Sequence, residues 1–251
     1  MPEMSFSTSS LRKEIMSNTI LSVSSDSKTV KGEKFGYLTG IFYGSPAKES
    51  GVLNACPNSS PACRTLCLYN QGRASVFKTI KEARIRKTKE FKFESETFRE
   101  KLRKEIALLV KKAKAKGMIP AIRLNGTTDF PWESIPVGDK PNLMAHFPDV
   151  QFYDYTKSPI RILKQLPKNY HLTFSRSEDN DAQVDYAISR GVNVAVVFRS
   201  KQLPETWKGR QVVNGDLSDL RFLDPRGVIV GLSAKGTAKK DQSGFVIDST
   251  N

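Results

Sequence analysis

Cysteine, histidine and tryptophan are scarce in this chain, and long apolar runs are absent. Its 251 residues include 3 cysteines, 2 histidines and 2 tryptophans. An odd number of cysteines cannot close into disulfides alone, and so sparse a set is typical of a reducing compartment. No apolar run reaches the roughly 18 residues of a membrane span. Residues 1–34 lack the apolar core of a signal peptide, and we therefore expect a cytoplasmic protein.

Positive charge is plentiful and unevenly placed. The formal net charge is +14, and the segment from Arg73 to Lys116 holds 16 Lys or Arg residues against 6 Asp or Glu. So dense a basic field suits a polyanion, whether nucleic acid, an acidic protein surface or a phosphorylated ligand. A charge-rich face is more often simply solvated, with Lys–Glu pairs along the helix.

Two helices are predicted within this basic segment. The first runs from Ala74 to about Phe91, with Val76, Ile80 and Ala83 on one face. The second runs from a Ser95 N-cap to a stop at Gly117. Its apolar positions recur every three or four residues, at Phe98, Leu102, Ile106, Leu109 and Ala113. Both helices are therefore expected to bury one stripe and to show water a basic face.

All three cysteines, Cys56, Cys63 and Cys67, fall within one short segment. Three thiolates from one loop are typical of a metal or cluster site with one position left open. The spacing C-x6-C-x3-C lacks the C-x2-C pair usual in structural zinc sites, and both histidines, His146 and His171, lie far along the chain. We favour a 4Fe-4S cluster, with zinc as the alternative and idle thiols in a reducing cytosol as the third interpretation.

Short apolar strands alternate with helical stretches along the rest of the chain, which favours a parallel sheet with right-handed crossovers. The strands are predicted at Tyr37–Tyr43, Met118–Leu124, Val150–Tyr153, His171–Phe174, Val192–Phe198, Arg210–Val213 and Val228–Leu232. We expect an α/β fold, a (β/α) barrel, complete or partial, with the cysteine loop after the first strand. Residues 35–251 would form this single domain, and residues 1–34 a flexible polar arm or a loosely docked first strand.

A polar cluster follows each predicted strand, at the end where parallel sheets and barrels gather active residues. Asp154 with Lys157, and Arg176 with Glu178, are expected to form charge pairs there. Each such residue taken singly is also typical of a turn or a helix N-cap, but their recurrence indicates a site. The candidate catalytic residues are Asp129, Glu133, Asp154, Lys157, Arg176, Glu178, Asp216 and Lys235.

Several motifs, taken together, match one family. They are Tyr37-Leu38-Thr39-Gly40-Ile41, Cys56-Pro57 with Cys63 and Cys67-Leu68, Gly72-Arg73, Arg123 to Thr127 with Asp129 and Trp132-Glu133, Phe152 to Lys157, Leu172 to Ser175, Asn193 to Phe198, Gly215-Asp216 with Asp219 to Arg221, and Gly231-Leu232 with Lys235-Gly236. With these motifs the chain resembles the gene product 88 family of tailed phages. The resemblance covers about residues 36–247 and implies a phage origin, hence the host cytoplasm, but no particular activity.

A second resemblance implies a mechanism. A cysteine triplet after the first strand of a barrel, with a glycine-bearing polar motif after the second, is similar to the plan of radical S-adenosylmethionine enzymes. That resemblance implies a four-iron cluster on the three cysteines and S-adenosylmethionine bound near Asn125, Gly126, Thr127 and Asp129. The chain departs from the plan, because the usual spacing is C-x3-C-x2-C and no aromatic residue directly precedes Cys67.

Two other functions remain open from the sequence. The cysteines could hold a structural zinc in a nucleic-acid-binding protein whose basic helices, between Arg73 and Lys116, contact phosphates. Alternatively, carboxylates around a divalent cation could form a hydrolase or nuclease. The carboxylates considered for that cation are Asp129, Glu133, Asp154, Glu178 and Asp216.

Overall fold

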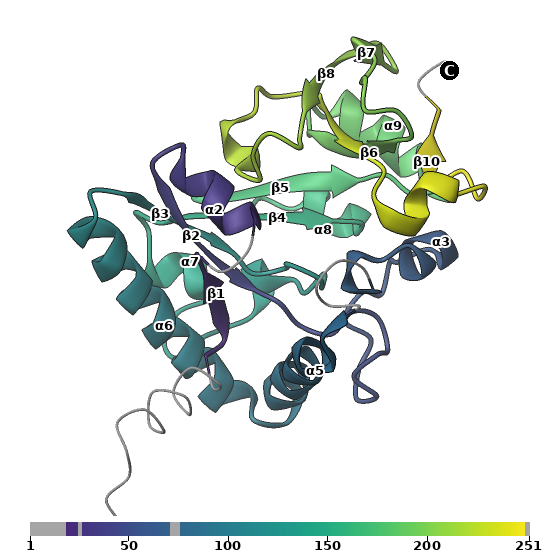
Figure 1. The fold of residues 1–251 in the computed structure, drawn as a ribbon. Coiled ribbons are helices and arrows are strands. Elements are labelled where there is room, and N and C mark those ends of the chain that lie inside the picture. The colour runs from purple at the N-terminus through teal and green to yellow at the C-terminus, as the bar shows by residue number, and fades with distance from the viewer. Residues whose placement is uncertain (1–18, 25–26, 71–75, 249–251) are drawn as a thin grey trace, which may run out of the picture.

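The computed structural model describes residues 19–24, 27–70 and 76–248, which fold as a mixed α/β protein on a ten-stranded sheet (Figure 1). The strands are β1 (Leu21–Val23), β2 (Tyr37–Phe42), β3 (Ile119–Arg123), β4 (Gln151–Thr156), β5 (Tyr170–Ser175), β6 (Val194–Phe198), β7 (Thr206–Trp207), β8 (Arg210–Asn214), β9 (Ile229–Ser233) and β10 (Val246–Ile247). The helices are α2 (Ser27–Glu33), α3 (Pro61–Thr65), α5 (Lys78–Phe93), α6 (Ser95–Ala115), α7 (Leu143–His146), α8 (Pro159–Leu163) and α9 (Asp181–Ser189).

Most of the sheet is parallel. The strands from β2 to β8 pair in parallel in the order β2-β3-β4-β5-β6-β9-β8, and β1 and β7 add antiparallel strands at the two ends. From β2 to β6 the strands follow chain order, so successive crossovers run in one direction and place their helices on one face. Helix α6 lies against β2 and β3, and α9 lies against β5 and β6.

Side chains that alternate along each strand separate the two faces of the sheet. Ile122 of β3 and Phe152 of β4 lie in the main core with the buried stripe of α6. Their chain neighbours Ala121 and Tyr153 point to the other face and pack with Leu220. The second face is therefore covered by the segment around residue 220 and not by the crossover helices.

Helix α6 has the predicted stripe and C-terminal stop, but its N-cap is Glu94, without a side-chain capping bond, and not Ser95. Its stripe from Phe98 to Ala113 is buried, and Gly117 adopts a φ of +63° just beyond the helix, a conformation that favours glycine. The stripe predicted for the first helix is wrong. Helix α5 begins at Lys78, Val76 precedes it and is 75% exposed, and the residue that α5 buries is Thr88. The Thr88 hydroxyl accepts a hydrogen bond of 2.8 Å from the Ser45 N–H, because α5 packs on the long loop after β2.

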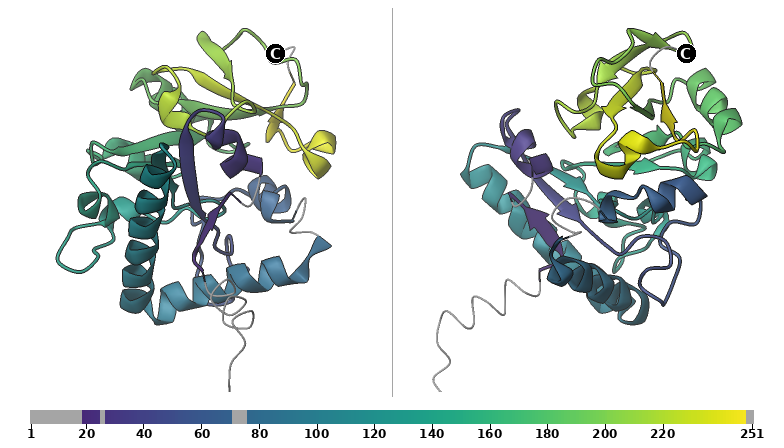
Figure 2. Two further views of the ribbon diagram at one scale, coloured as in Figure 1. Left: turned by 60° about the vertical axis from the view of Figure 1, so that its left-hand side comes forward. Right: turned by 45° about the vertical axis from the view of Figure 1, so that its right-hand side comes forward.

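The sheet opens between β5 and β6, and β10 fills the opening. Phe174 and Ser175 of β5 pair with the first half of β6. The second half pairs instead with β10, through Val197 opposite Val246. The C-terminal segment thereby reaches α3, where Leu66 packs against Val246 and its neighbours. Figure 2 shows this yellow segment lying over α3.

The α/β class and the mostly parallel sheet are confirmed. Among the described strands the pairing runs from β1 to β7 without joining the two ends, so the predicted barrel is not confirmed. Residues 1–18 of the predicted arm lie outside the described residues. The later part forms β1, paired with β2, and α2. The side chain of Glu105 accepts hydrogen bonds from the N–H groups of Ile20 and Leu21, which fixes the start of β1 on α6.

No helix in the described part of the chain is long and apolar enough to cross a membrane.

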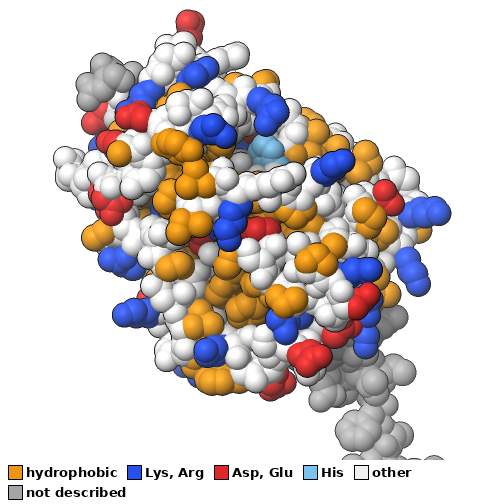
Figure 3. Space-filling view, turned by 180° about the vertical axis from the view of Figure 1, so that it is seen from behind, with side chains coloured by type: hydrophobic (Ala, Val, Ile, Leu, Met, Phe, Trp, Pro, Cys, Tyr) orange, Lys and Arg blue, Asp and Glu red, His pale blue; other side chains and the backbone are white. Residues whose placement is uncertain are grey.

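On the face turned away from the viewer in Figure 1, apolar side chains gather near the centre, and Lys and Arg side chains lie around them (Figure 3).

Candidate functional site

One cavity opens at the carboxyl ends of the parallel strands. Its volume is about 410 Å³, which is within the range of small-molecule sites. Residues that end or follow β3, β4, β5, β6, β8 and β9 line it, together with the cysteine-bearing loop. This is the edge of an open α/β sheet where ligands are usually bound.

Most of the residues predicted to form a site line this cavity. They are Cys56, Cys63, Cys67, Asn125, Gly126, Thr127, Asp129, Lys157, Arg176, Asp216 and Lys235. Glu133, Asp154 and Glu178 do not line it. Asp154 and Glu178 are hydrogen-bonded to segments that build its wall, and Glu133 is bonded to Arg161, which in turn holds Asp129. The strand-end pattern therefore located one site, but it did not separate the residues that face a ligand from those that support them.

The loop that carries the cysteines is fixed by the short helix α3. Ser60 caps this helix, and its hydroxyl accepts a hydrogen bond of 3.0 Å from the Cys63 N–H. All three thiols are partly buried and line the same cavity. Within the described ranges, no group of three Cys, His, Asp or Glu side chains is placed to hold a metal ion.

Burial raises the pKa of all three thiols. It raises the pKa of Cys56 to about 12, and the pKa values of Cys63 and Cys67 are raised for the same reason. The thiols also raise one another's pKa, because a charge on one disfavours ionisation of the next. At Cys63 the Lys157 ammonium opposes the effect of burial. The three side chains are therefore neutral thiols at pH 7, and a metal would displace their protons on binding.

Glu178 holds α3 in place from the loop after β5. Its carboxylate accepts hydrogen bonds of 2.7 Å from the Ser60 hydroxyl and 2.9 Å from the Ala62 N–H. The negative charge lies at the first turn of α3, where unpaired N–H groups favour an anion. Glu178 thus supports the segment that carries Cys63 and Cys67, although it does not line the cavity.

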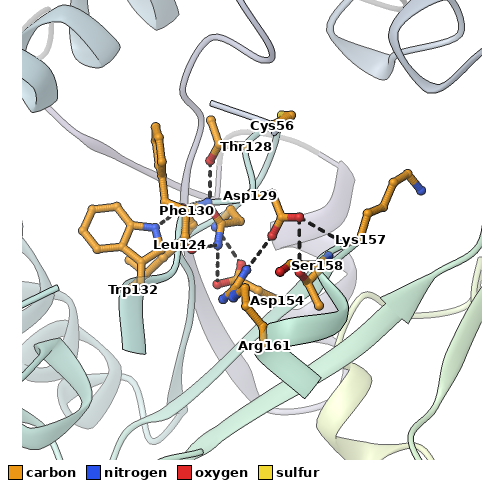
Figure 4. A network of polar contacts seen from close by, with 12 residues as sticks. Cys56, Leu124, Thr128, Asp129, Phe130, Trp132, Asp154, Lys157, Ser158 and Arg161 are labelled. Carbon is orange, nitrogen blue, oxygen red and sulfur yellow. Dashed lines mark hydrogen bonds and ion pairs between the residues drawn. The ribbon is translucent and has the colours of Figure 1, made fainter. Parts of the chain in front are cut away.

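A buried arginine joins two of the predicted carboxylates. Arg161 of α8 is 3% exposed. Its guanidinium donates two hydrogen bonds of 2.9 Å to Glu133 and one of 2.5 Å to Asp129. The other Asp129 oxygen accepts hydrogen bonds from the Thr156 hydroxyl and the Lys157 N–H. Figure 4 shows Asp129 between Arg161 and the chain at Lys157. Both carboxylates are therefore occupied by the protein itself.

Asp154 and Asn125 form a buried part of the same network. One Asp154 oxygen accepts a hydrogen bond of 2.6 Å from the Asn125 N–H, and the other accepts one of 2.8 Å from the Tyr170 hydroxyl. The Asn125 side chain accepts hydrogen bonds from Thr128 and Phe130, so it shapes the turn that presents residues 126–129 to the cavity. Burial raises the pKa of Asp154 to about 7, against the opposing charge of Arg161.

The two predicted charge pairs do not form among the described residues. Lys157 points away from Asp154 (Figure 4), and its ammonium donates to the Ser175 and Arg176 carbonyls and lies 5.4 Å from the centre of the Phe245 ring. Arg176 bonds to Asp181 and to carbonyls of the C-terminal segment, including that of Phe245 at 3.1 Å. The first pair fails because Asp154 is buried within β4 while the Lys157 ammonium reaches the carbonyls that follow β5. The second fails because Arg176 bonds to the C-terminal segment and Asp181, whereas Glu178 bonds to α3.

Gly126 and Thr127 follow β3 at the rim of the cavity. A Cβ on Gly126 would lie 2.6 Å from the Tyr43 ring and 2.8 Å from the Ile41 side chain, so the residue must be small to pack here. The Thr127 hydroxyl donates a hydrogen bond of 2.6 Å to the Gly44 carbonyl. The Cys56 thiol lies 3.7 Å from the Thr127 carbonyl, which brings the cysteine loop against this turn.

Asp216 and Lys235 form a charge pair in the cavity wall. Their side chains are 2.7 Å apart, and the second Asp216 oxygen accepts a hydrogen bond of 2.9 Å from the Ser233 N–H. Burial alone would raise the pKa of Asp216, but the Lys235 and Ser233 hydrogen bonds outweigh it and lower the pKa. Lys31 of α2 donates to the Asp216 carbonyl. The loop after β8 is thereby tied to both α2 and β9.

Sequence reasoning missed Arg123 and Tyr155, which also line the cavity. Arg123 pairs with Asp219 at 2.7 Å and lies over the Tyr155 ring at 4.7 Å. Both residues alternate with core residues, Arg123 with Ile122 and Tyr155 with Asp154. That alternation is the signal that could have placed them on the open face of the sheet.

Fold and site together define an α/β protein with a cysteine-lined cavity at the carboxyl edge of a mostly parallel sheet. The Gene product 88 family matches the chain over residues 10–249, and the chain belongs to that family. The phage gene product family expected from the motifs is thereby confirmed. Searches of curated proteins and of solved structures gave no match, and the comparisons do not support the expected resemblance to radical S-adenosylmethionine enzymes.

Proposed function

We propose that the chain is a phage iron–sulfur protein in which Cys56, Cys63 and Cys67 hold a four-iron cluster beside the strand-end residues. The observation that carries the proposal is that all the cysteines of the chain line the same cavity. In such clusters Cys thiolates bind the irons. Three thiolates leave one iron free for a small molecule, and the cavity has room for one.

The cysteine spacing favours a cluster over zinc. C-x6-C-x3-C lacks the C-x2-C pair usual in structural zinc sites, and both histidines lie far along the chain. A structural zinc takes four protein ligands, whereas three thiolates suffice for a cluster with one open iron. Cations also lie near the thiols, with Lys157 beside Cys63 and Arg84 beside Cys67.

S-adenosylmethionine is the ligand that we propose for the free iron. A reduced cluster supplies the electron that cleaves the sulfonium bond of this molecule. The turn that follows β3 offers Gly126 and Thr127 to hold it, and both line the cavity. Asp129 also lines the cavity, and its carboxylate, held by Arg161 and the Lys157 N–H, fixes the end of this turn. Asn125 supports that turn through hydrogen bonds to Thr128 and Phe130. The remaining candidates that face the cavity, Lys157, Arg176, Asp216 and Lys235, are proposed to position a substrate.

Anaerobic purification with iron, sulfide and zinc analysis tests the proposal. We expect about four irons and four sulfides per chain and a broad absorption band in the visible range. Both should be absent from the variant with all three cysteines changed to Ala. Ser59→Ala is the matched control, because Ser59 lines the same cavity on the same loop but carries no thiol. A colourless wild-type protein with one zinc, or a triple variant with wild-type iron content, would overturn the cluster.

The cofactor is tested separately from the cluster. After reduction with dithionite, the wild-type protein should release 5′-deoxyadenosine from S-adenosylmethionine, and the triple cysteine variant should not. An iron-loaded protein that leaves S-adenosylmethionine intact would contradict the cofactor and leave the cluster standing.

The hydrolase alternative has fewer carboxylates available to bind a divalent cation than expected, because Asp129 and Glu133 are both bonded to Arg161.

Nucleic acid is the partner that we propose for the basic helices. The end of α6 exposes Lys111, Lys112, Lys114 and Lys116 together. Changing all four to Gln should weaken binding to a DNA duplex and lower the salt dependence, by about 0.9 in the log–log slope for each phosphate that is no longer neutralised. Lys164→Gln with Lys168→Gln, two exposed changes elsewhere, is the control. Equal salt-dependence slopes for both variants and wild type would rule this surface out as the nucleic-acid contact.

The host cytoplasm stays our prediction for where the protein acts.

A further inference from the structure

The loop after β8 gathers a second set of charges on the cavity wall. Lys31, Arg123 and Lys235 line the cavity there, together with Asp216 and Asp219 of the loop. Lys31 donates to the Asp216 carbonyl and Lys235 pairs with the Asp216 carboxylate, while Arg123 pairs with Asp219 three residues further along the same loop. None of the three cysteines takes part in these bonds. Three cations against two carboxylates leave this part of the wall positive.

Arg123 is buried but has donors to spare. The residue is 5% exposed, and its guanidinium carbon lies 4.7 Å from the centre of the Tyr155 ring. Only Nη1 has a hydrogen bond to a described residue, the one to Asp219. Nε is buried and has no partner among the described residues. A buried guanidinium with unused N–H groups is costly unless a further acceptor is supplied, and the side chain lines a cavity from which one can come.

Lys31 adds a cation that no carboxylate of the described residues neutralises. Among the described residues, the acceptor for its ammonium is the Asp216 backbone carbonyl. The Asp216 side chain is already used by Lys235 and by the Ser233 N–H. Lys31 is exposed on α2, so its ammonium can turn toward an anion in the cavity at little cost. Arg123 and Lys31 together resemble the paired donors that bind carboxylate and phosphate oxygens.

Apolar side chains stand beside these charges. Ala195 and Val197 of β6 and Leu232 of β9 line the same cavity. Small aliphatic residues leave room for the body of a ligand, and the charged wall fixes one end of it. We propose that Arg123 and Lys31 bind the carboxylate or phosphate group of a small organic molecule whose apolar part lies against β6 and β9.

Titration of the whole chain with inorganic phosphate and, separately, with acetate tests this site by calorimetry at matched ionic strength. We expect wild-type protein to bind at least one of the two. Lys31→Gln should weaken that binding about tenfold or more, because it removes a charge-assisted hydrogen bond. Arg123→Lys keeps the charge but not the planar donors, and it should weaken binding as well. The anion that binds more tightly identifies whether the site prefers a phosphate or a carboxylate group.

Lys168→Gln is the matched control, since it removes one exposed lysine that does not line the cavity. It should bind like wild type. Should Arg123→Lys fail to fold, the exposed Lys31→Gln still decides the matter. Binding by Lys31→Gln that equals that of Lys168→Gln, or a wild type that binds neither anion, would overturn the proposal.

The anion site does not depend on the cluster. The triple cysteine variant should bind phosphate or acetate as the wild type does, because none of the bonds that form the site involves a thiol. A protein without iron whose anion binding is weakened by Lys31→Gln would contradict the cluster and support the anion site. An iron-loaded protein whose anion binding is unchanged by Lys31→Gln would contradict the anion site and support the cluster.

Discussion

Glu178 accepts a 2.7 Å hydrogen bond from Ser60, although 118 positions separate the two residues in the chain. The contact joins the loop after β5 to the cap of α3. A carboxylate that sequence reasoning assigned to catalysis therefore acts on the segment that carries the cysteines.

Glu178→Ala should destabilise the fold by about 1–2 kcal/mol, because it removes the acceptor for the Ser60 hydroxyl and leaves the Ala62 N–H at the start of α3 unpaired. We also expect a lower iron content after reconstitution, since Cys63 and Cys67 would be held less firmly. Urea unfolding and iron analysis measure the two effects. Asp149→Ala, an exposed carboxylate, is the control. A Glu178→Ala protein as stable as that control would show that the contact does not hold α3.

Arg161→Met should be among the most destabilising single changes in this chain. It would leave Asp129 and Glu133 buried without their partner, a loss of about 3–5 kcal/mol for a buried ion pair. Arg161→Lys should recover only part of this, because one ammonium cannot make the two parallel bonds to Glu133.

Urea unfolding measures both Arg161 variants. Arg190→Met is the control, since that side chain is exposed at the end of α9, and it should change stability by less than about 0.5 kcal/mol. A cost for Arg161→Met no larger than that of Arg190→Met would show that the network stabilises little.

Asp154 should make stability fall as pH rises. Burial raises its pKa from 3.8 to about 7 in the folded protein, so the folded state holds a proton that the unfolded state has lost across that interval. The contribution of this proton is fully present below pH 3.8 and disappears as pH rises through about 7.

Asp154→Asn removes this titration while keeping an oxygen for the Asn125 N–H. The free energy of unfolding of wild type minus that of the variant should therefore decrease between pH 4 and pH 7, about the interval between the two pKa values. Asp149→Asn, at an exposed position, should give a curve parallel to wild type. A difference that stays constant with pH would show that Asp154 is ionised throughout.

Gly126→Ala should cost about 1–3 kcal/mol, because the new Cβ would overlap the Tyr43 ring. A double-mutant cycle with Tyr43→Ala tests the cause. In the Tyr43→Ala background the cost should shrink, since the ring that the Cβ meets is gone. An unchanged cost would point to the backbone and away from packing.

The elements that the sequence pattern predicts well are those whose pattern is local. Val194–Phe198 is a continuous apolar run, and the stripe of α6 consists of regularly spaced buried residues from Phe98 to Ala113. β10 has two residues and no pattern of its own, and it exists because β6 offers an unpaired edge where β5 stops. Helix α5 was misjudged because its buried residue, Thr88, is polar and packs on a loop.

The site was predicted to a similar extent. The strand-end rule found the cavity, since parallel strands bring their carboxyl ends to one edge. That rule could not separate Asp154 from Asp216, because both are carboxylates near the carboxyl end of a strand. Asp154 shares a face with Phe152 and is buried, whereas Asp216 lies in the loop after β8 and lines the cavity. Only strand register and the reach of Arg161 distinguish them.

The place of β10 also sets an order of events during synthesis. Phe245 and the neighbouring β10 complete a cavity whose cysteines leave the ribosome far earlier. Until β10 has emerged, the second half of β6 is an open edge and the cysteine loop lacks its cover. A metal bound at this site would therefore be enclosed only after β10 has emerged and paired with β6.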